Sequence, residues 1–240
     1  MRRSLLPAPR LRPLSLWGLI RVHLRLAREG LAAVAVLGLL SWAFLAQGER
    51  LLGHPVAPHT LLRLAEEFLV LGALPVAVPL WADVEGRRPA LWRALPFHRG
   101  AVVALRLVLP VLVYVLVAAP VLLEGKGQVE AFGGSLDAVQ ALGMVLMGVP
   151  VAALLSAVTG AVAVASRAPL AGAAAGLAWW AVESITRGDL SGNLFLFAAS
   201  EGKVAGASLV ANRLALAGLA VVAAAAAWWG YRRDERFLRI

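Results

Sequence analysis

The apolar run "AVVALRLVLPVLVYVLVAAPVLL", residues 101–123, decides the fold class, because it holds one charged side chain in 23 positions. A helix of about 20 residues crosses the roughly 30 Å hydrocarbon core of a bilayer. Membrane-spanning strands would instead read as alternating segments of about 10 residues. This run is continuous and therefore predicts a transmembrane helix.

The rest of the chain repeats this pattern. It has 240 residues, 60% of them hydrophobic, and a mean hydropathy of +0.79, whereas soluble domains are about 45–50% apolar. The apolar residues predict an all-α polytopic membrane protein with six transmembrane helices. The predicted spans are about 31–46, 64–81, 101–123, 139–166, 168–184 and 209–229. Only "SRAP", residues 166–169, separates the fourth and fifth, which predicts a tight helical hairpin.

The N-terminal region divides into two parts. Residues 1–13 are rich in Pro and Arg and are expected to form a flexible basic terminus, followed by a single transmembrane domain over residues 14–240. Residues 14–29 predict an amphipathic helix in the cytoplasmic interface. Its signature residues are Trp17, Arg21, Arg25 and Arg28. The alternative is a cytoplasmic extension of the first span.

The basic residues predict the orientation. With a cytoplasmic N-terminus, sixteen arginines flank the spans on the cytoplasmic side, against at most six Lys or Arg on the other. The positive-inside rule then places both termini in the cytoplasm and the chain in the inner (cytoplasmic) membrane as a multi-pass protein. The net charge of +9 is thus interpreted as a topology signal, with lipid bilayer and no nucleic acid as partner. The first apolar run is expected to be an uncleaved anchor.

The sequence contains no recognisable enzymatic motif. The pattern G-x-x-x-x-G-K-[ST] is absent, as are G-x-S-x-G and H-E-x-x-H, and there is no cysteine. No catalytic, metal or cofactor residue is therefore predicted, and the chain is not expected to be an enzyme. His54 and His59, near Glu66 and Glu67, are a weak metal pattern and are interpreted as ordinary loop residues.

Few ionisable residues fall inside the spans. Glu66, Glu67 and Glu183 lie at predicted outer ends and Arg106 near an inner end. They are interpreted as boundary residues that reach the interface, with an outer gate as the functional alternative. The lack of mid-membrane charge argues against a proton-coupled transporter. Span prolines predict kinks, which serve either an apolar lumen or packing alone; they are Pro75, Pro79, Pro110, Pro120 and Pro150.

A basic break, "EGRRPALWRALPFHRG" at residues 85–100, precedes the third span. Pro89 and Pro96 are placed to begin and end two turns of helix. An aromatic anchor with an arginine rim is typical of a protein docking surface. The alternative is a basic loop on anionic lipid. The predicted docking residues are Glu85, Gly86, Arg87, Arg88, Leu91, Trp92, Arg93, Leu95, Pro96 and Arg99.

The stretch "DVEGRRPALWRALPFHRGAVVALRLV", residues 83–108, resembles the link between the second and third spans of type-2 ABC exporter permeases. In that family an acidic residue and Gly precede Leu-Pro-x-x-Arg and a basic residue in the next span. The matching positions are Asp83 or Glu85, Gly86, Leu95-Pro96, Arg99 and Arg106, although Lys is common at the last. The chain's end is similar to the family's last span at Asn212, Arg213, Arg232, Arg233 and Asp234. The architectural resemblance covers nearly the whole chain, with loose motifs.

The resemblance implies a permease subunit that forms the substrate path of an exporter. Its partners would be two copies of a separate ABC ATPase, which would hold ATP and Mg, and a second permease, identical or homologous. The 85–100 stretch would contain the coupling helix that enters a groove on the ATPase. Two alternatives stay open: a non-transporting membrane scaffold subunit and an ATP-independent secondary transporter.

Overall fold

The computed structural model describes residues 15–47, 56–85, 99–131, 133–202 and 207–233, and all regular structure within these ranges is helical. Four helices are long and apolar enough to cross a membrane: Arg28–Ala46, Gly100–Ala131, Ala138–Ser166 and Ser208–Arg233. The protein is therefore helical, and these four candidate spans indicate a membrane protein. The predicted N-terminal stretch 1–13 lies outside the described residues.

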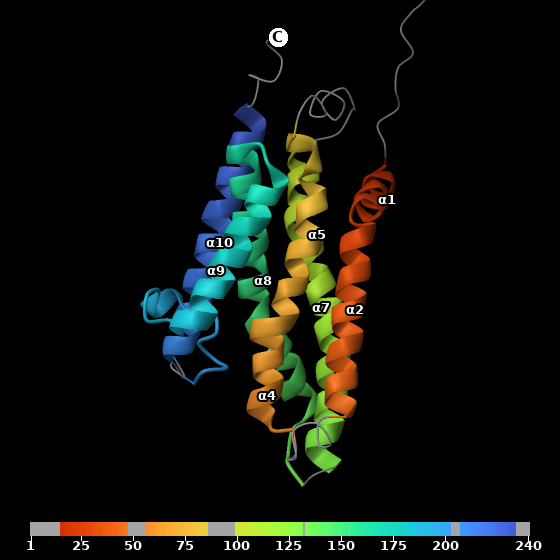
Figure 1. The fold of residues 1–240 in the computed structure, drawn as a ribbon, viewed down its shortest axis with the longest axis vertical. Helices are drawn as coiled ribbons and strands as arrows, with labels where there is room; N and C mark the ends of the chain where they lie inside the picture. Colours follow the sequence, from red (N-terminus) through yellow and green to blue (C-terminus); the bar gives the residue numbers. More distant parts are fainter. Residues whose placement is uncertain (1–14, 48–55, 86–98, 132, 203–206, 234–240) are drawn as a thin grey trace, which may run out of the picture.

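The helices form a bundle in which successive segments run in opposite directions (Figure 1). The short α1 continues through Ala27 into the first long helix. In chain order the α-helices are α1 (Leu16–Leu26), α2 (Arg28–Ala46), α4 (Pro58–Arg63), α5 (Ala73–Leu80), α7 (Arg99–Ala131), α8 (Ala138–Ser166), α9 (Pro169–Thr186) and α10 (Ala207–Arg233). As a result α1, the end of α5 and the end of α10 lie at the same end of the bundle.

The segment predicted as the second span is not one regular helix. A π-helical turn η1 (Leu64–Phe68) and a 3-10 turn η2 (Leu69–Gly72) separate α4 from α5. Pro75 and Pro79 have no N–H to donate to the preceding turn, which weakens regular α-helical bonding in this region. A π turn also rotates the side chains that follow it, and η1 carries Glu66 and Glu67.

The structure contradicts the predicted end of the third span but agrees with the predicted connection at residues 166–169. The charged residues after the predicted span 101–123 predict a loop over residues 124–138. This prediction is wrong in its first half, because α7 continues to Ala131. The charges there support the helix, since Lys126 donates to Glu130 one turn later at 2.7 Å. The predicted tight helical hairpin is confirmed between α8 and α9. Only Arg167 and Ala168 separate α8 from α9.

The core is centred on α8, which packs against α7, α9 and α10. Half of the candidate span in α8 is buried, but only 22% of that in α10, so α10 presents most of its apolar surface outward. The segment after α9 contains "NLFLFAAS", which is apolar but too short to cross a membrane and predicts a re-entrant or interfacial piece. Its Phe195, Leu196 and Phe197 are buried in the main core.

Candidate functional site

A buried ion pair joins the 3-10 turn that follows α5 to the first turns of α7. The Arg106 guanidinium on α7 donates to both oxygens of Asp83, at 2.7 and 2.9 Å. Asp83 lies in the 3-10 turn η3 (Ala82–Val84), and the Tyr231 hydroxyl of α10 also donates to it, at 2.9 Å. Arg106 has no exposed surface and Asp83 has 5%. Bidentate, charge-assisted bonds of this kind are among the strongest in proteins.

Aromatic rings enclose the Arg106 guanidinium. Its central carbon lies 5.1 Å from the ring centroids of both Trp81 and Tyr231, within cation–π range. The two rings meet edge to face at 6.1 Å. Gly160 of α8 makes room for Trp81, because a Cβ there would come within 2.7 Å of the indole. We call Trp81, Asp83, Arg106 and Tyr231 the Arg106 cluster.

His23 brings α1 to the same region. Its side chain is buried and its Nδ1 lies 2.9 Å from the carbonyl oxygen of Leu19. Burial lowers the pKa of His23, the Leu19 carbonyl opposes this, and the nearby Arg106 charge lowers the pKa further. The cluster therefore lies where α1, α5, α7, α8 and α10 meet.

The Arg106 cluster brackets the predicted docking surface. Asp83 precedes that stretch and Arg106 follows it, while Glu85 is exposed after η3 and Arg99 begins α7. The other predicted docking residues lie outside the described residues; they are Gly86, Arg87, Arg88, Leu91, Trp92, Arg93, Leu95 and Pro96. Arg106 does not reach the interface as the sequence suggested. It is paired inside the bundle.

A second polar cluster lies at the opposite end. Glu66 has no exposed surface, accepts a hydrogen bond from Arg213 of α10, and accepts another from the Ser200 backbone N–H at 2.8 Å. Arg213 also donates to the Leu196 carbonyl at 3.0 Å. Asn212 donates to the Phe195 carbonyl, also at 3.0 Å. These α10 side chains satisfy backbone carbonyls of the non-helical segment that follows α9.

The neighbouring Glu67 completes this cluster. It accepts from the Arg63 Nε and from the Ser200 hydroxyl, each at 3.2 Å. Its backbone carbonyl accepts from the Trp180 indole at 2.7 Å, a bond that the π turn makes available. Arg63 also reaches Glu201 at 2.5 Å. We call Arg63, Glu66, Glu67, Ser200 and Arg213 the Glu66 cluster.

The three predicted boundary or outer-gate residues thus all have partners inside the protein. Glu66 and Glu67 meet in the Glu66 cluster, whereas Glu183 is buried on α9 and accepts from the Ser191 hydroxyl at 2.8 Å. The expectation that they reach the interface is wrong for Glu66 and Glu183. Hydropathy alone could not show that charges distant in sequence pair.

The described residues do not support a metal site at His54 and His59. His54 lies outside the described ranges and His59 is exposed on α4. In the part of the chain that the structure describes, no group of three or more His, Cys, Asp or Glu side chains could hold a metal ion.

The residues predicted to mark an interfacial helix are exposed. Trp17 is 63% exposed, and Arg21 lies 6.0 Å from its ring. Arg25 and Arg28 are also exposed. The buried contacts of α1 with the bundle come from Leu19 and His23.

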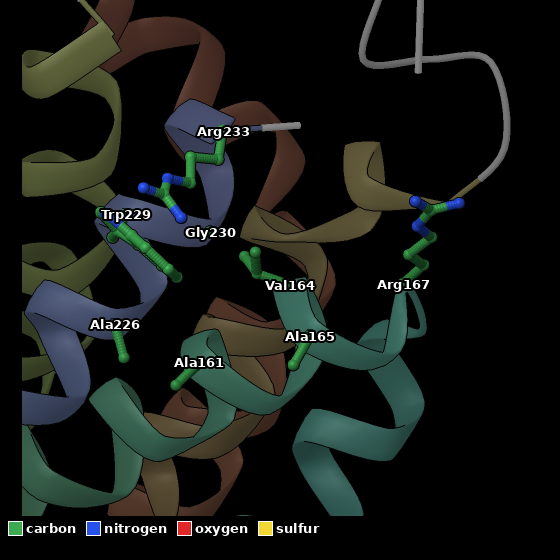
Figure 2. Close-up of a pocket in the computed structure, with 8 residues that line it drawn as sticks. All are labelled: Ala161, Val164, Ala165, Arg167, Ala226, Trp229, Gly230 and Arg233. Carbon is green, nitrogen blue, oxygen red and sulfur yellow. The ribbon is translucent and has the colours of Figure 1, made fainter. Parts of the chain in front are cut away.

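Two hollows lie along the central helices. One is a cleft of 490 Å³ between the ends of α8 and α10, with Arg167, Trp229 and Arg233 among its lining residues (Figure 2). The other is an apolar groove of 370 Å³ between α7, α8 and α10, which Pro150 lines from α8.

The charged residues divide between the two ends of the bundle. The end that carries α1 holds the described arginines Arg21, Arg25, Arg28, Arg106, Arg167, Arg232 and Arg233, with only Glu29, Asp83 and Glu85 as described acidic residues. We call it the arginine-rich end. The other end holds the Glu66 cluster and most of the acidic side chains.

No protein-family model matches the chain, and neither the curated proteins nor the solved structures contain a match.

Proposed function

We propose that the chain is the membrane-spanning permease subunit of an ATP-driven type-2 ABC exporter. It would form the substrate path and couple to a separate ATPase subunit. The proposal starts from the sequence resemblance of residues 83–108 and of the last helix. The observation that carries it is the Arg106 cluster.

The Arg106 cluster is suited to transmit force. The 85–100 stretch would hold the coupling helix, and the chain on both sides of it is tied to the cluster through Asp83 and Arg106. Tyr231 extends the connection to α10. A displacement of the docking stretch by an ATPase would therefore act on η3, α7 and α10 together. Packed polar networks of this kind can move as units between discrete arrangements.

Such a permease would have six passes. Beyond the four candidate spans, α9, with 18 residues and about 27 Å of helix, would be the fifth. The composite segment from α4 to α5 would be the sixth. The exposed Trp17 and the arginines of α1 suit a helix that lies in the membrane interface. The arginine-rich end would face the cytoplasm.

The expected assembly has two copies of this permease, or this chain and a homologous one, with two ATPase subunits that bind ATP and Mg. This chain has no P-loop, which agrees with an energy source on another polypeptide. The apolar groove between α7, α8 and α10 suits a hydrophobic or amphipathic substrate.

The test is co-purification from native membranes. The tagged full-length chain is solubilised in detergent, and the proteins that accompany it are identified. We expect a stoichiometric ATPase subunit with a P-loop. The Trp92→Asp/Leu95→Asp variant should lose it while still inserting in the membrane. The control Leu190→Asp places a new negative charge on an exposed turn outside the predicted docking stretch and should retain the ATPase.

Other outcomes separate the alternatives. An ATPase that binds but shows no substrate-dependent activity would favour the scaffold subunit. A preparation without any ATPase, from membranes that express the partners, would overturn the proposal and favour an ATP-independent transporter.

A further inference from the structure

We propose that the cleft between the ends of α8 and α10 binds the phosphate of an anionic phospholipid from the leaflet at the arginine-rich end. This site goes beyond the proposed function. It rests only on the location of α8 and α10 in a membrane, and it does not need an ATPase or a transported substrate.

The cleft carries positive charge from two different helices. Arg167 follows the last residue of α8, Arg233 is the last residue of α10, and Figure 2 shows them on opposite sides of the cleft. The residues that line it, all within the described part of the chain, include no acidic side chain. Basic pockets between transmembrane helices on the cytoplasmic side are typical sites for anionic headgroups.

Trp229 helps to organise this charge. The Arg233 guanidinium lies over the Trp229 ring at 3.8 Å from its centroid. Stacking fixes the guanidinium plane and leaves its N–H groups directed outward along the edge, where they can donate to phosphate oxygens. Trp229 is 56% exposed, as expected for an aromatic residue at the membrane interface.

The walls of the cleft are small and apolar. Ala161 and Ala165 of α8 and Ala226 of α10 leave a volume of 490 Å³. This space accommodates a headgroup with its glycerol, while the outward apolar surface of α10 can accompany an acyl chain. A free anion would not need such walls.

The adjacent Arg232 distinguishes this site from a general basic surface. It is exposed and carries the same charge at the next position of α10, yet it does not line the cleft. A bilayer that only attracted the positive end would respond equally to both arginines. A built site would depend on Arg233 and Arg167.

The test counts bound lipid by native mass spectrometry. Delipidated full-length protein in neutral detergent is titrated with dioleoyl-phosphatidylglycerol or dioleoyl-phosphatidylcholine. We expect wild type to prefer phosphatidylglycerol by at least about tenfold, since phosphatidylcholine has the same phosphate but adds a choline cation that the two arginines repel. Arg167→Gln/Arg233→Gln should lose this preference, while Arg232→Gln should keep it. Ala226→Phe, which fills the cleft without changing charge, should also lose it.

The contrary results are equally clear. Equal loss in Arg232→Gln would overturn the site in favour of general surface attraction. Full binding by Ala226→Phe would overturn the placement in the cleft. Competition by millimolar inorganic phosphate as strong as that by phosphatidylglycerol would show a free-anion site and overturn the lipid assignment. None of these results depends on whether an ATPase co-purifies.

Discussion

Arg106 is a charged side chain without exposed surface. The carboxylate of Asp83 compensates its buried positive charge. Removing one partner of a buried pair leaves the other charge desolvated and uncompensated. The pair therefore fixes the position of η3 against α7 more firmly than hydrophobic contact alone, because the alternative arrangements leave an ion in an apolar surrounding.

We expect Asp83→Asn and Arg106→Gln each to lower the free energy of unfolding by about 3–5 kcal/mol. The double variant should lose clearly less than the sum, because it leaves no unpaired charge. Unfolding of the purified variants in detergent measures this coupling. Strictly additive losses would contradict the pairing.

His23 makes the stability of the folded protein depend on pH. Burial lowers its pKa below the ordinary 6.5, so the folded protein favours the neutral ring. The resulting stability is present above about pH 6.5 and is lost as pH falls towards the lower pKa of the folded state. We expect the thermal midpoint in detergent to fall over this range in wild type, and to fall less in His23→Gln. His59→Gln, at an exposed histidine, should behave as wild type.

At the scale of elements, close helix contacts depend on single glycines. Gly172 of α9 faces the backbone of α8, where a Cβ would lie 2.3 Å from the Thr159 carbonyl oxygen. The short connection through Arg167 and Ala168 leaves the hairpin little room to separate. The contact between α8 and α9 therefore requires a residue without a side chain.

We expect Gly172→Ala to destabilise the protein by about 1–3 kcal/mol through overpacking. Gly143→Ala is the matched control, because no atom lies within 4 Å of the Cβ that it would add to α8. That substitution should be neutral or stabilising by up to about 1 kcal/mol, since Ala favours the helix. Thermal unfolding of both variants, compared with wild type, measures these changes in stability. A neutral Gly172→Ala would contradict the close approach.

At the scale of the whole molecule, the ends of the bundle differ in charge, and the proposed orientation follows from this difference. The chain has no cysteine, so one introduced thiol reports its own location without background. Arg232 lies in the last turn of α10, at the arginine-rich end, and Leu190 lies in the turn that follows the far end of α9; both are exposed.

We expect Leu190→Cys to react with a membrane-impermeant maleimide in intact cells or spheroplasts. Arg232→Cys should react only after lysis, because its end would face the cytoplasm in the proposed orientation. The cysteine-free wild type controls for background. The reverse pattern would invert the orientation, and equal labelling in intact cells would contradict a membrane-spanning arrangement.

The features that could be predicted from the sequence depend on residues that are close together along the chain. The apolar runs and the "SRAP" connection lead to the four candidate spans and the α8–α9 hairpin, because helix formation and turn geometry depend on neighbouring residues. The end of α7 was predicted too early, because charged residues after 123 were interpreted as a loop. Their i,i+4 pairing continues the helix instead.

The sequence by itself determined a helical, strongly apolar chain with its arginines beside the apolar runs. Only the tertiary structure decided the partners of the buried charges. Arg213 is 147 residues from Glu66, and Tyr231 is 148 residues from Asp83. Such pairs form because burial makes an unpaired charge costly, and the packing of distant helices selects the partner. That selection is a property of the assembled bundle, which no local pattern records.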